Sequence, residues 1–133
     1  MGRYFHVVLE YDGENPVRNT FLCEIGDFYY SELRYWEDLY DSDLRKHSDK
    51  KHSIKTQKVL DCGGFYSWGI NNIPKKIEAI RKEIEQDTEL GGQGKKNLNG
   101  VIYDLQKLHD TAMEKCSENN INTEKCYINW CIQ

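Results

Sequence analysis

A segment rich in glycine and lysine, Glu89–Gly100 (ELGGQGKKNLNG), raises the sharpest chemical question in the sequence. A phosphate-binding P-loop has the pattern GxxxxGK followed by Ser or Thr, and it lies between a strand and a helix. Here Glu89 stands where the first glycine is required, and Lys96 stands where a hydroxyl must hold magnesium. The residues before the segment also have a helical pattern, so this is not a nucleotide-hydrolysis loop.

A weaker hypothesis for this segment is a contact with an anion. Backbone amides at the start of a helix attract anions, and the candidate ligand-binding residues beside them are Gly94, Lys95, Lys96 and Asn97. The alternative is a turn between two helices whose lysines are solvated. Both interpretations place these residues in a loop that precedes a helix.

A basic segment, Arg45–Ser53, repeats the tripeptide Lys-His-Ser. Its imidazoles and ammonium groups could hold phosphates or respond to pH near neutrality, and the alternative is a solvated helix end. Two histidines five residues apart do not share one helical face, so metal binding is not expected. The candidate anion or partner contacts are Arg45, Lys46, His47, Lys51 and His52.

An aromatic segment, Phe65–Asn72 (FYSWGINN), combines rings with amide side chains next to glycines. Aromatic side chains with polar tips are typical of ligand pockets and of protein interfaces. The alternative is a set of rings packed over the core. The candidate ligand-binding residues are Tyr66, Trp68, Asn71 and Asn72.

The cysteines and the remaining histidines have no spacing that predicts catalysis. The five cysteines include no CxxC pair, which argues against a zinc site. A nucleophilic cysteine needs a base beside it, and nothing in the spacing brings His6 or His109 to one. We therefore predict no catalytic residue, no metal ligand and no cofactor.

The overall composition narrows the classes of function. The 133 residues have a formal net charge of −4, which lacks the basic excess of a dedicated DNA-binding protein. No apolar run is long enough for a membrane span, and the N-terminus does not have the pattern of a secretory signal. Together with the odd number of cysteines, this predicts a cytoplasmic protein with reduced thiols.

Hydrophobic periodicity predicts the elements that would position these residues. Strands are expected at Arg3–Tyr11 and Thr20–Tyr29, which form a hairpin, then at Ile54–Cys62 and Lys125–Ile132, with Phe65–Ile70 as a short strand or a loop. A helix is expected from Ser31 onward. Another helix begins at Pro74, buries Ile73, Ile77, Ile80 and Ile84, and stops at Gly91–Gly92; the last helix runs from about Leu98 to the sequence SENN.

This order predicts one α+β domain over residues 1–133. The expected fold is a mostly antiparallel sheet of about four strands, with one face covered by a C-terminal helical hairpin and a third helix. Cys126, Ile128 and Trp130 would share one face of the last strand, which would pair with the first strand.

The function that fits these features is a small, non-catalytic binding or inhibitory protein. Its partner would be a protein or a small anionic, nucleotide-like ligand, as for toxin-immunity proteins or phage and viral counter-defence proteins. The alternative is a small enzyme that acts on a phosphorylated or nucleotide substrate with a histidine as general base. An open strand edge at the C-terminus would also allow the chain to form homo-oligomers.

Overall fold

The fold is an α+β arrangement built on a four-stranded antiparallel sheet, which confirms the expected class. The structure is a computed structural model that describes residues 4–29, 49–61 and 66–132. The strands lie in the order β2-β1-β4-β3, and every neighbouring pair is antiparallel. Their bounds are β1 Tyr4–Tyr11, β2 Thr20–Tyr29, β3 Tyr66–Gly69 and β4 Cys126–Ile132.

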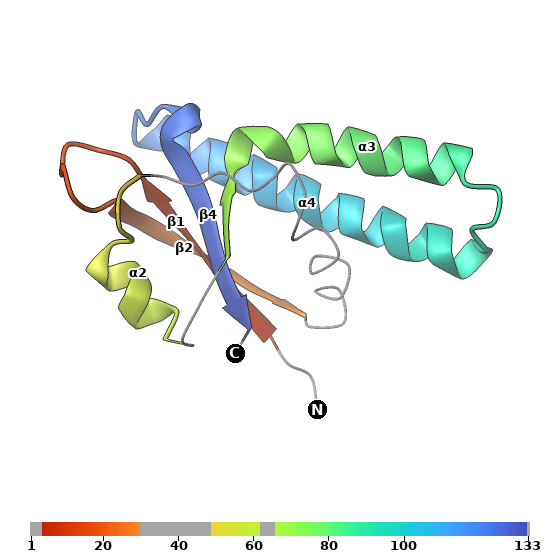
Figure 1. Ribbon diagram of the computed structural model, residues 1–133, viewed down its shortest axis with the longest axis horizontal. Helices are drawn as coiled ribbons and strands as arrows, with labels where there is room; N and C mark the ends of the chain where they lie inside the picture. Colours follow the sequence, from red (N-terminus) through yellow and green to blue (C-terminus); the bar gives the residue numbers. More distant parts are fainter. Residues whose placement is uncertain (1–3, 30–48, 62–65, 133) are drawn as a thin grey trace.

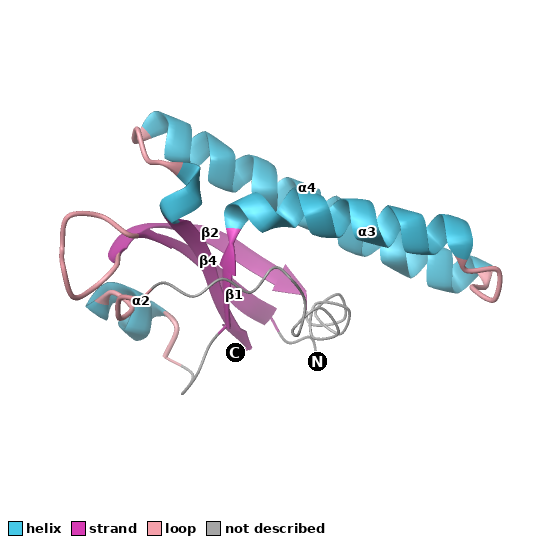
Figure 2. Cartoon of the chain, turned by 45° about the horizontal axis from the view of Figure 1, so that its top comes forward, coloured by secondary structure: helices cyan, strands magenta, loops and turns pink. Residues whose placement is uncertain are grey.

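A long helical hairpin covers one face of this sheet. It consists of α3 (Ile73–Gln86) and α4 (Gly92–Glu118), and it extends well beyond the strands (Figures 1 and 2). A single turn of 3-10 helix, Ile70–Asn72, links β3 to α3, and a second one, Thr123–Lys125, leads into β4. The short helix α2 (Ile54–Val59) lies on the opposite side of the sheet.

The main core lies between the sheet and the hairpin. Val7 and Leu9 of β1 pair with Trp130 and Ile128 of β4, and all four side chains are fully buried. Trp68 of β3 packs edge-to-face on Trp130, with ring centroids 5.4 Å apart. The isoleucine stripe of α3 and the apolar stripe of α4 close this core from above, through Ile73, Ile77, Ile80, Val101, Ile102, Leu105 and Leu108.

Several predicted elements are confirmed by these contacts. The last strand does pair with the first, and Cys126, Ile128 and Trp130 share its buried face. The aromatic segment contains the short strand β3, so the strand interpretation holds over Tyr66–Gly69. The helix predicted from Ser31, the third helix expected to cover the sheet, lies outside the described residues.

The strand predicted at Ile54–Cys62 is wrong, because this segment begins with helix α2. Ser53 caps that helix: its Oγ accepts a hydrogen bond from the amide of Thr56 at 2.9 Å. A strand would have put Ile54 and Thr56 on one face, whereas Thr56 is buried and Ile54 is exposed. The β-branched residues favoured a strand by propensity, and the cap together with burial of Thr56 and Leu60 outweighs that preference.

The predicted boundary between the two hairpin helices is also wrong. Helix α3 ends at Gln86 rather than at Gly91–Gly92. The side chain of Asp87 explains this early end, since its Oδ1 accepts a hydrogen bond from the amide of Glu89 at 2.9 Å and forms a local turn. Helix α4 then begins at Gly92, so Lys95 and its neighbours belong to the helix and not to a loop before it.

We expect the buried face of α4 to carry most of the stability that the hairpin provides. Leu105→Ala removes a fully buried side chain and should lower the free energy of unfolding by about 2–5 kcal/mol. The matched control is Tyr103→Ala, two residues away on the exposed face, which should change it by less than about 0.5 kcal/mol. Urea unfolding followed by circular dichroism measures both, and equal losses would contradict this assignment of the core.

Candidate functional site

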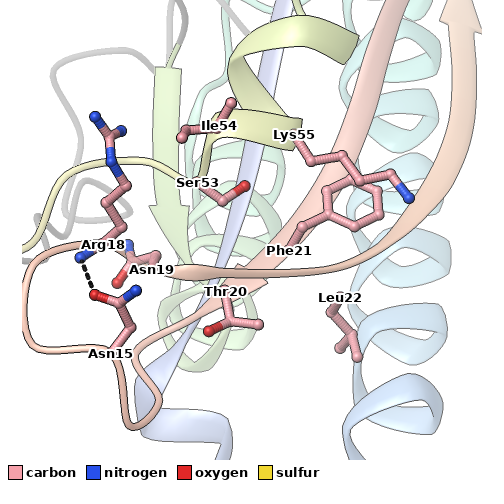
Figure 3. Close-up of a pocket in the computed structure, with 9 residues that line it drawn as sticks. All are labelled: Asn15, Arg18, Asn19, Thr20, Phe21, Leu22, Ser53, Ile54 and Lys55. Atoms are coloured by element: carbon pink, nitrogen blue, oxygen red, sulfur yellow. Dashed lines mark hydrogen bonds between the residues drawn. The ribbon is translucent and has the colours of Figure 1, made fainter.

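An open groove lies between the start of β2 and the N-terminal end of α2 (Figure 3). Its volume is about 550 Å³. One wall comes from the β1–β2 loop and the first residues of β2, and the other comes from the residues that begin α2. The lining residues are Asn15, Arg18, Asn19, Thr20, Phe21, Leu22, Ser53, Ile54 and Lys55.

Backbone hydrogen bonds hold the two walls of the groove together. The amide of Asn19 donates to the carbonyl of Lys51 at 2.7 Å, and the amide of Lys51 donates to the carbonyl of Val17 at 2.9 Å. The guanidinium of Arg18 adds a bond from Nη1 to the carbonyl of His52 at 2.9 Å. These bonds join two segments that lie more than thirty residues apart in the chain.

The β1–β2 loop is shaped by an asparagine side chain. Oδ1 of Asn15 accepts hydrogen bonds from the amides of Val17 and Arg18, each at 2.9 Å. Such a turn is a common use of asparagine, because its short side chain reaches backbone amides two and three residues ahead. The turn sets the direction in which Arg18 leaves the loop, beside Asn15 in Figure 3.

Beneath the groove, the fully buried carboxylate of Glu10 connects both walls to β1. Its Oε1 accepts a hydrogen bond from Nδ2 of Asn19 at 3.3 Å and forms an ion pair with Nδ1 of His52. Its Oε2 accepts a hydrogen bond from the amide of Ser53 at 3.1 Å. Burying a carboxylate is costly unless it is paired and hydrogen-bonded, and these partners meet that requirement.

The pKa of Glu10 is lowered from its ordinary value of 4.5. Burial alone would raise this pKa, but the hydrogen bond and the charge of His52, with smaller contributions from Ser53 and Thr56, outweigh burial. Glu10 is therefore ionised in the folded protein at neutral pH. About a third of the His52 side chain remains exposed while its ring binds Glu10.

Among the described residues that line the groove, two are cationic and none is acidic. Lys55 extends its Nζ over the ring of Phe21, 4.6 Å from the ring centroid. Within the described ranges, neither Arg18 nor Lys55 lies within ion-pair distance of a carboxylate. By contrast, Lys50 nearby is bound to Asp12 and to the carbonyl of Gly13. Arg18 and Lys55 thus retain positive charge that the described part of the chain does not neutralise.

The residues singled out in the glycine-rich and aromatic segments are far apart in the structure. Lys95 and Lys96 are exposed in the first turns of α4, with Gly94 and Asn97, at the end of the hairpin farthest from the sheet (Figure 1). Trp68 is buried in the core, in the packing role that was the alternative interpretation of the aromatic segment. Tyr66 lies in β3, and Asn71 and Asn72 lie in the turn before α3. These two groups do not converge on one surface.

The basic segment has a different outcome. Arg45, Lys46 and His47 lie outside the described residues. Lys51 and His52 do lie beside the groove. The backbone of Lys51 pairs with that of Arg18 in an isolated β-bridge, and the ring of His52 binds the carboxylate of Glu10.

Sequence reasoning missed the other groove residues, including Glu10, Arg18 and Lys55. The only feature of the sequence at this site is an acidic residue, Glu10, in a strand with an alternating pattern. That feature does not indicate that His52 and Ser53 contact Glu10 in the folded chain. That partnership spans more than forty positions and depends on tertiary structure.

The described residues contain no group of three or more His, Cys, Asp and Glu side chains arranged to hold a metal ion. Three free cysteines, Cys23, Cys116 and Cys126, lie near the end of α4, and burial raises the pKa of each of them. Such thiols are poor nucleophiles at neutral pH. Among the described helices, none has the length and apolar character to cross a membrane.

We predict that Glu10→Gln destabilises the α2 side of the protein. The amide cannot accept all the hydrogen bonds of the carboxylate and leaves Nδ1 of His52 without its carboxylate partner, so the free energy of unfolding at pH 7 should fall by about 1–3 kcal/mol. The wild type should also lose stability as the pH falls below about 4.5. A carboxyl whose folded-state pKa is lowered stabilises the fold above its unfolded pKa and loses that contribution as it is protonated.

Urea unfolding of both proteins between pH 7 and pH 3 tests this pair of statements. The difference in stability between wild type and Glu10→Gln should shrink on acidification. A constant difference across this range would show that the ionised Glu10 is not the source of the effect.

Comparison of this chain with protein-family models, with curated proteins and with solved structures found no match. The groove and the Glu10–His52 pair beneath it are therefore the observations from which a function is inferred.

Proposed function

We propose that this protein is a binding protein that sequesters an anionic ligand in the groove between β2 and α2. The observation that carries the proposal is the pair of cations, Arg18 and Lys55, which line an open groove without a carboxylate partner among the described residues. A guanidinium offers a planar set of donors that matches carboxylate and phosphate oxygens, and an ammonium adds a second positive charge.

The charge distribution supports this choice of ligand. The chain as a whole has a formal net charge of −4, so the two groove cations form a locally positive site on an otherwise acidic protein, which would favour anionic over cationic partners. The groove is also lined by Asn15 and Thr20, whose Nδ2 and hydroxyl can donate hydrogen bonds to an anion. Lys95 and Lys96 do not line this groove and are exposed in the first turns of α4.

The proposed site predicts a specific loss of binding. With inorganic phosphate, citrate, AMP and polyglutamate as probes, at least one should shift the backbone NMR signals of Arg18, Asn19, Ser53 or Lys55. For a probe that binds, Lys55→Gln should weaken the affinity roughly tenfold, the equivalent of about 1.4 kcal/mol, because hydrogen bonds to charged groups contribute at least that much. Added salt should weaken it further.

Lys95→Gln/Lys96→Gln is the matched control, since it removes charge from the rival candidate site and should leave the affinity unchanged. Lys55 is the better test residue, because Arg18 also binds the carbonyl of His52 and its loss could disturb the fold. If no probe shifts the groove signals, or if only the hairpin variant loses binding, the groove is not the anion site.

A second candidate function is a small enzyme with His52 as general base. The observation in its favour is the imidazole of His52 held through Nδ1 by the buried Glu10, since a carboxylate that orients a histidine and stabilises its charged form is a recurring arrangement in catalysis. A phosphorylated or nucleotide substrate bound by Arg18 and Lys55 would then react nearby.

This enzyme hypothesis predicts turnover that depends on His52. Phosphate release from a panel of nucleotides and phosphate monoesters should be catalysed by the wild type and fall at least about 100-fold in His52→Ala. His109→Ala, on the far helix α4, should keep full activity. Absence of any turnover by the folded wild type would dismiss the enzyme hypothesis and leave the binding function standing.

A further inference from the structure

Two exposed apolar side chains flank the groove. Val17 is 56% exposed and Ile54 is 55% exposed, which is unusual for large apolar residues in this protein. The other exposed large apolar residues in the described part of the chain are Tyr103 and Met113, and both lie on α4. The β2–α2 side therefore exposes apolar surface at the same place as its unneutralised positive charge.

On each wall of the groove, an exposed apolar residue is followed directly by a cationic one. Val17 is followed by Arg18 on one wall, and Ile54 is followed by Lys55 on the other. The bond from the amide of Lys51 to the carbonyl of Val17 keeps the walls together. The result is a surface that presents two exposed apolar side chains and two cations, with Lys55 lying over the ring of Phe21.

The two cations do not converge on one point. In Figure 3, Arg18 and Lys55 extend from opposite sides of the groove, and Lys55 reaches over Phe21. Small-molecule sites enclose most of the ligand and aim a few polar groups at one place. An open groove with separated charges instead fits an extended ligand that carries more than one negative group.

Aromatic and arginine side chains are enriched at protein–protein contacts, and Phe21 and Arg18 both line this groove. Val17 and Ile54 would gain from burial against apolar side chains of a partner, while Arg18 and Lys55 would pair with its carboxylates. A free phosphate or a nucleotide phosphate would leave both apolar side chains exposed. Charge complementarity and apolar burial therefore both favour a protein segment over a free phosphate or a nucleotide as the occupant.

We propose that the occupant of the groove is an extended segment of a partner protein in which acidic side chains alternate with apolar ones. This inference rests on the proposed binding function and adds the class of ligand. Carboxylates of the segment bind Arg18 and Lys55, and its apolar side chains pack on Val17, Ile54 and the ring of Phe21.

A phage-displayed library of random dodecapeptides, selected on the immobilised full chain, tests the proposal. Enriched peptides should contain Asp or Glu beside Leu, Ile, Val or Phe. The strongest of them, made synthetically with a fluorescent label, should bind about tenfold more weakly to Lys55→Gln and also more weakly to Ile54→Ser. Both residues are exposed enough for these variants to fold, which thermal unfolding checks. Lys95→Gln/Lys96→Gln should bind as the wild type does.

Each outcome of the selection separates the two proposals. Acidic–apolar peptides that lose binding in both groove variants support the inference. If phosphate, citrate or AMP binds in the groove and no such peptide is enriched, the inference is overturned while the proposed function stands. If neither peptides nor small anions bind, both are overturned, and enriched peptides that tolerate the Lys55 and Ile54 variants overturn the inference alone.

Discussion

Burial of β1 on both of its faces is the constraint on which this side of the molecule depends. As an inner strand of the sheet, β1 directs Val7 and Leu9 into the core under the hairpin, and Val8 and Glu10 toward α2. Because side chains alternate between the two faces of a strand, Glu10 must point to the same side of the sheet as Val8. Its carboxylate must therefore find partners without water, and it obtains them from the β1–β2 loop and from the residues that begin α2.

That requirement explains why the groove exists in this place. Glu10 binds Asn19 of one wall and Ser53 of the other, so the residue that needs charge compensation also brings the two walls together. Apolar contact contributes less here, since Val8 and Leu60 are the buried residues of a small second cluster with Phe21 and Val59 packed beside them. A polar network of this type specifies one arrangement, because an unpaired member would be costly. The cations above it then remain on the surface, available to a ligand.

The fold was largely predictable from sequence because its main core follows simple periodicities. The stripe of Ile73, Ile77 and Ile80 and the alternation of Cys126, Ile128 and Trp130 each place apolar residues on one face. The segment from Ile54 failed because β-branched residues are compatible with both states, and only the Ser53 cap and the burial of Thr56 decide for a helix.

The groove could be predicted only in part. The basic repeat pointed to Lys51 and His52, but their buried partner Glu10 lies in a distant strand. Arg18 and Lys55 gave no signal of their own, since single basic residues in a loop and at a helix start are common. Their significance comes from the lack of an ion-pair partner among the residues that the structure describes, which depends on the fold and not on sequence spacing. Trp68 is a different case, because a glycine-bounded aromatic segment has the composition of a binding loop while the Trp68 ring is buried in the core.

The length of the hairpin divides the molecule into regions of unequal rigidity. Where α3 and α4 cross the sheet, Ile73, Ile80 and Leu105 are fully or almost fully buried, whereas Ile84 and Leu98 toward the far end are only partly buried. Beyond the strands (Figure 2), the two helices pack on each other and on no other element that the structure describes. Local opening costs least where buried apolar contact is thinnest, so backbone amides near the 87–91 turn should exchange with solvent deuterium long before those of β1 and β4. Fraying at that end should leave the groove undisturbed, because none of the residues described as lining it lies on the hairpin.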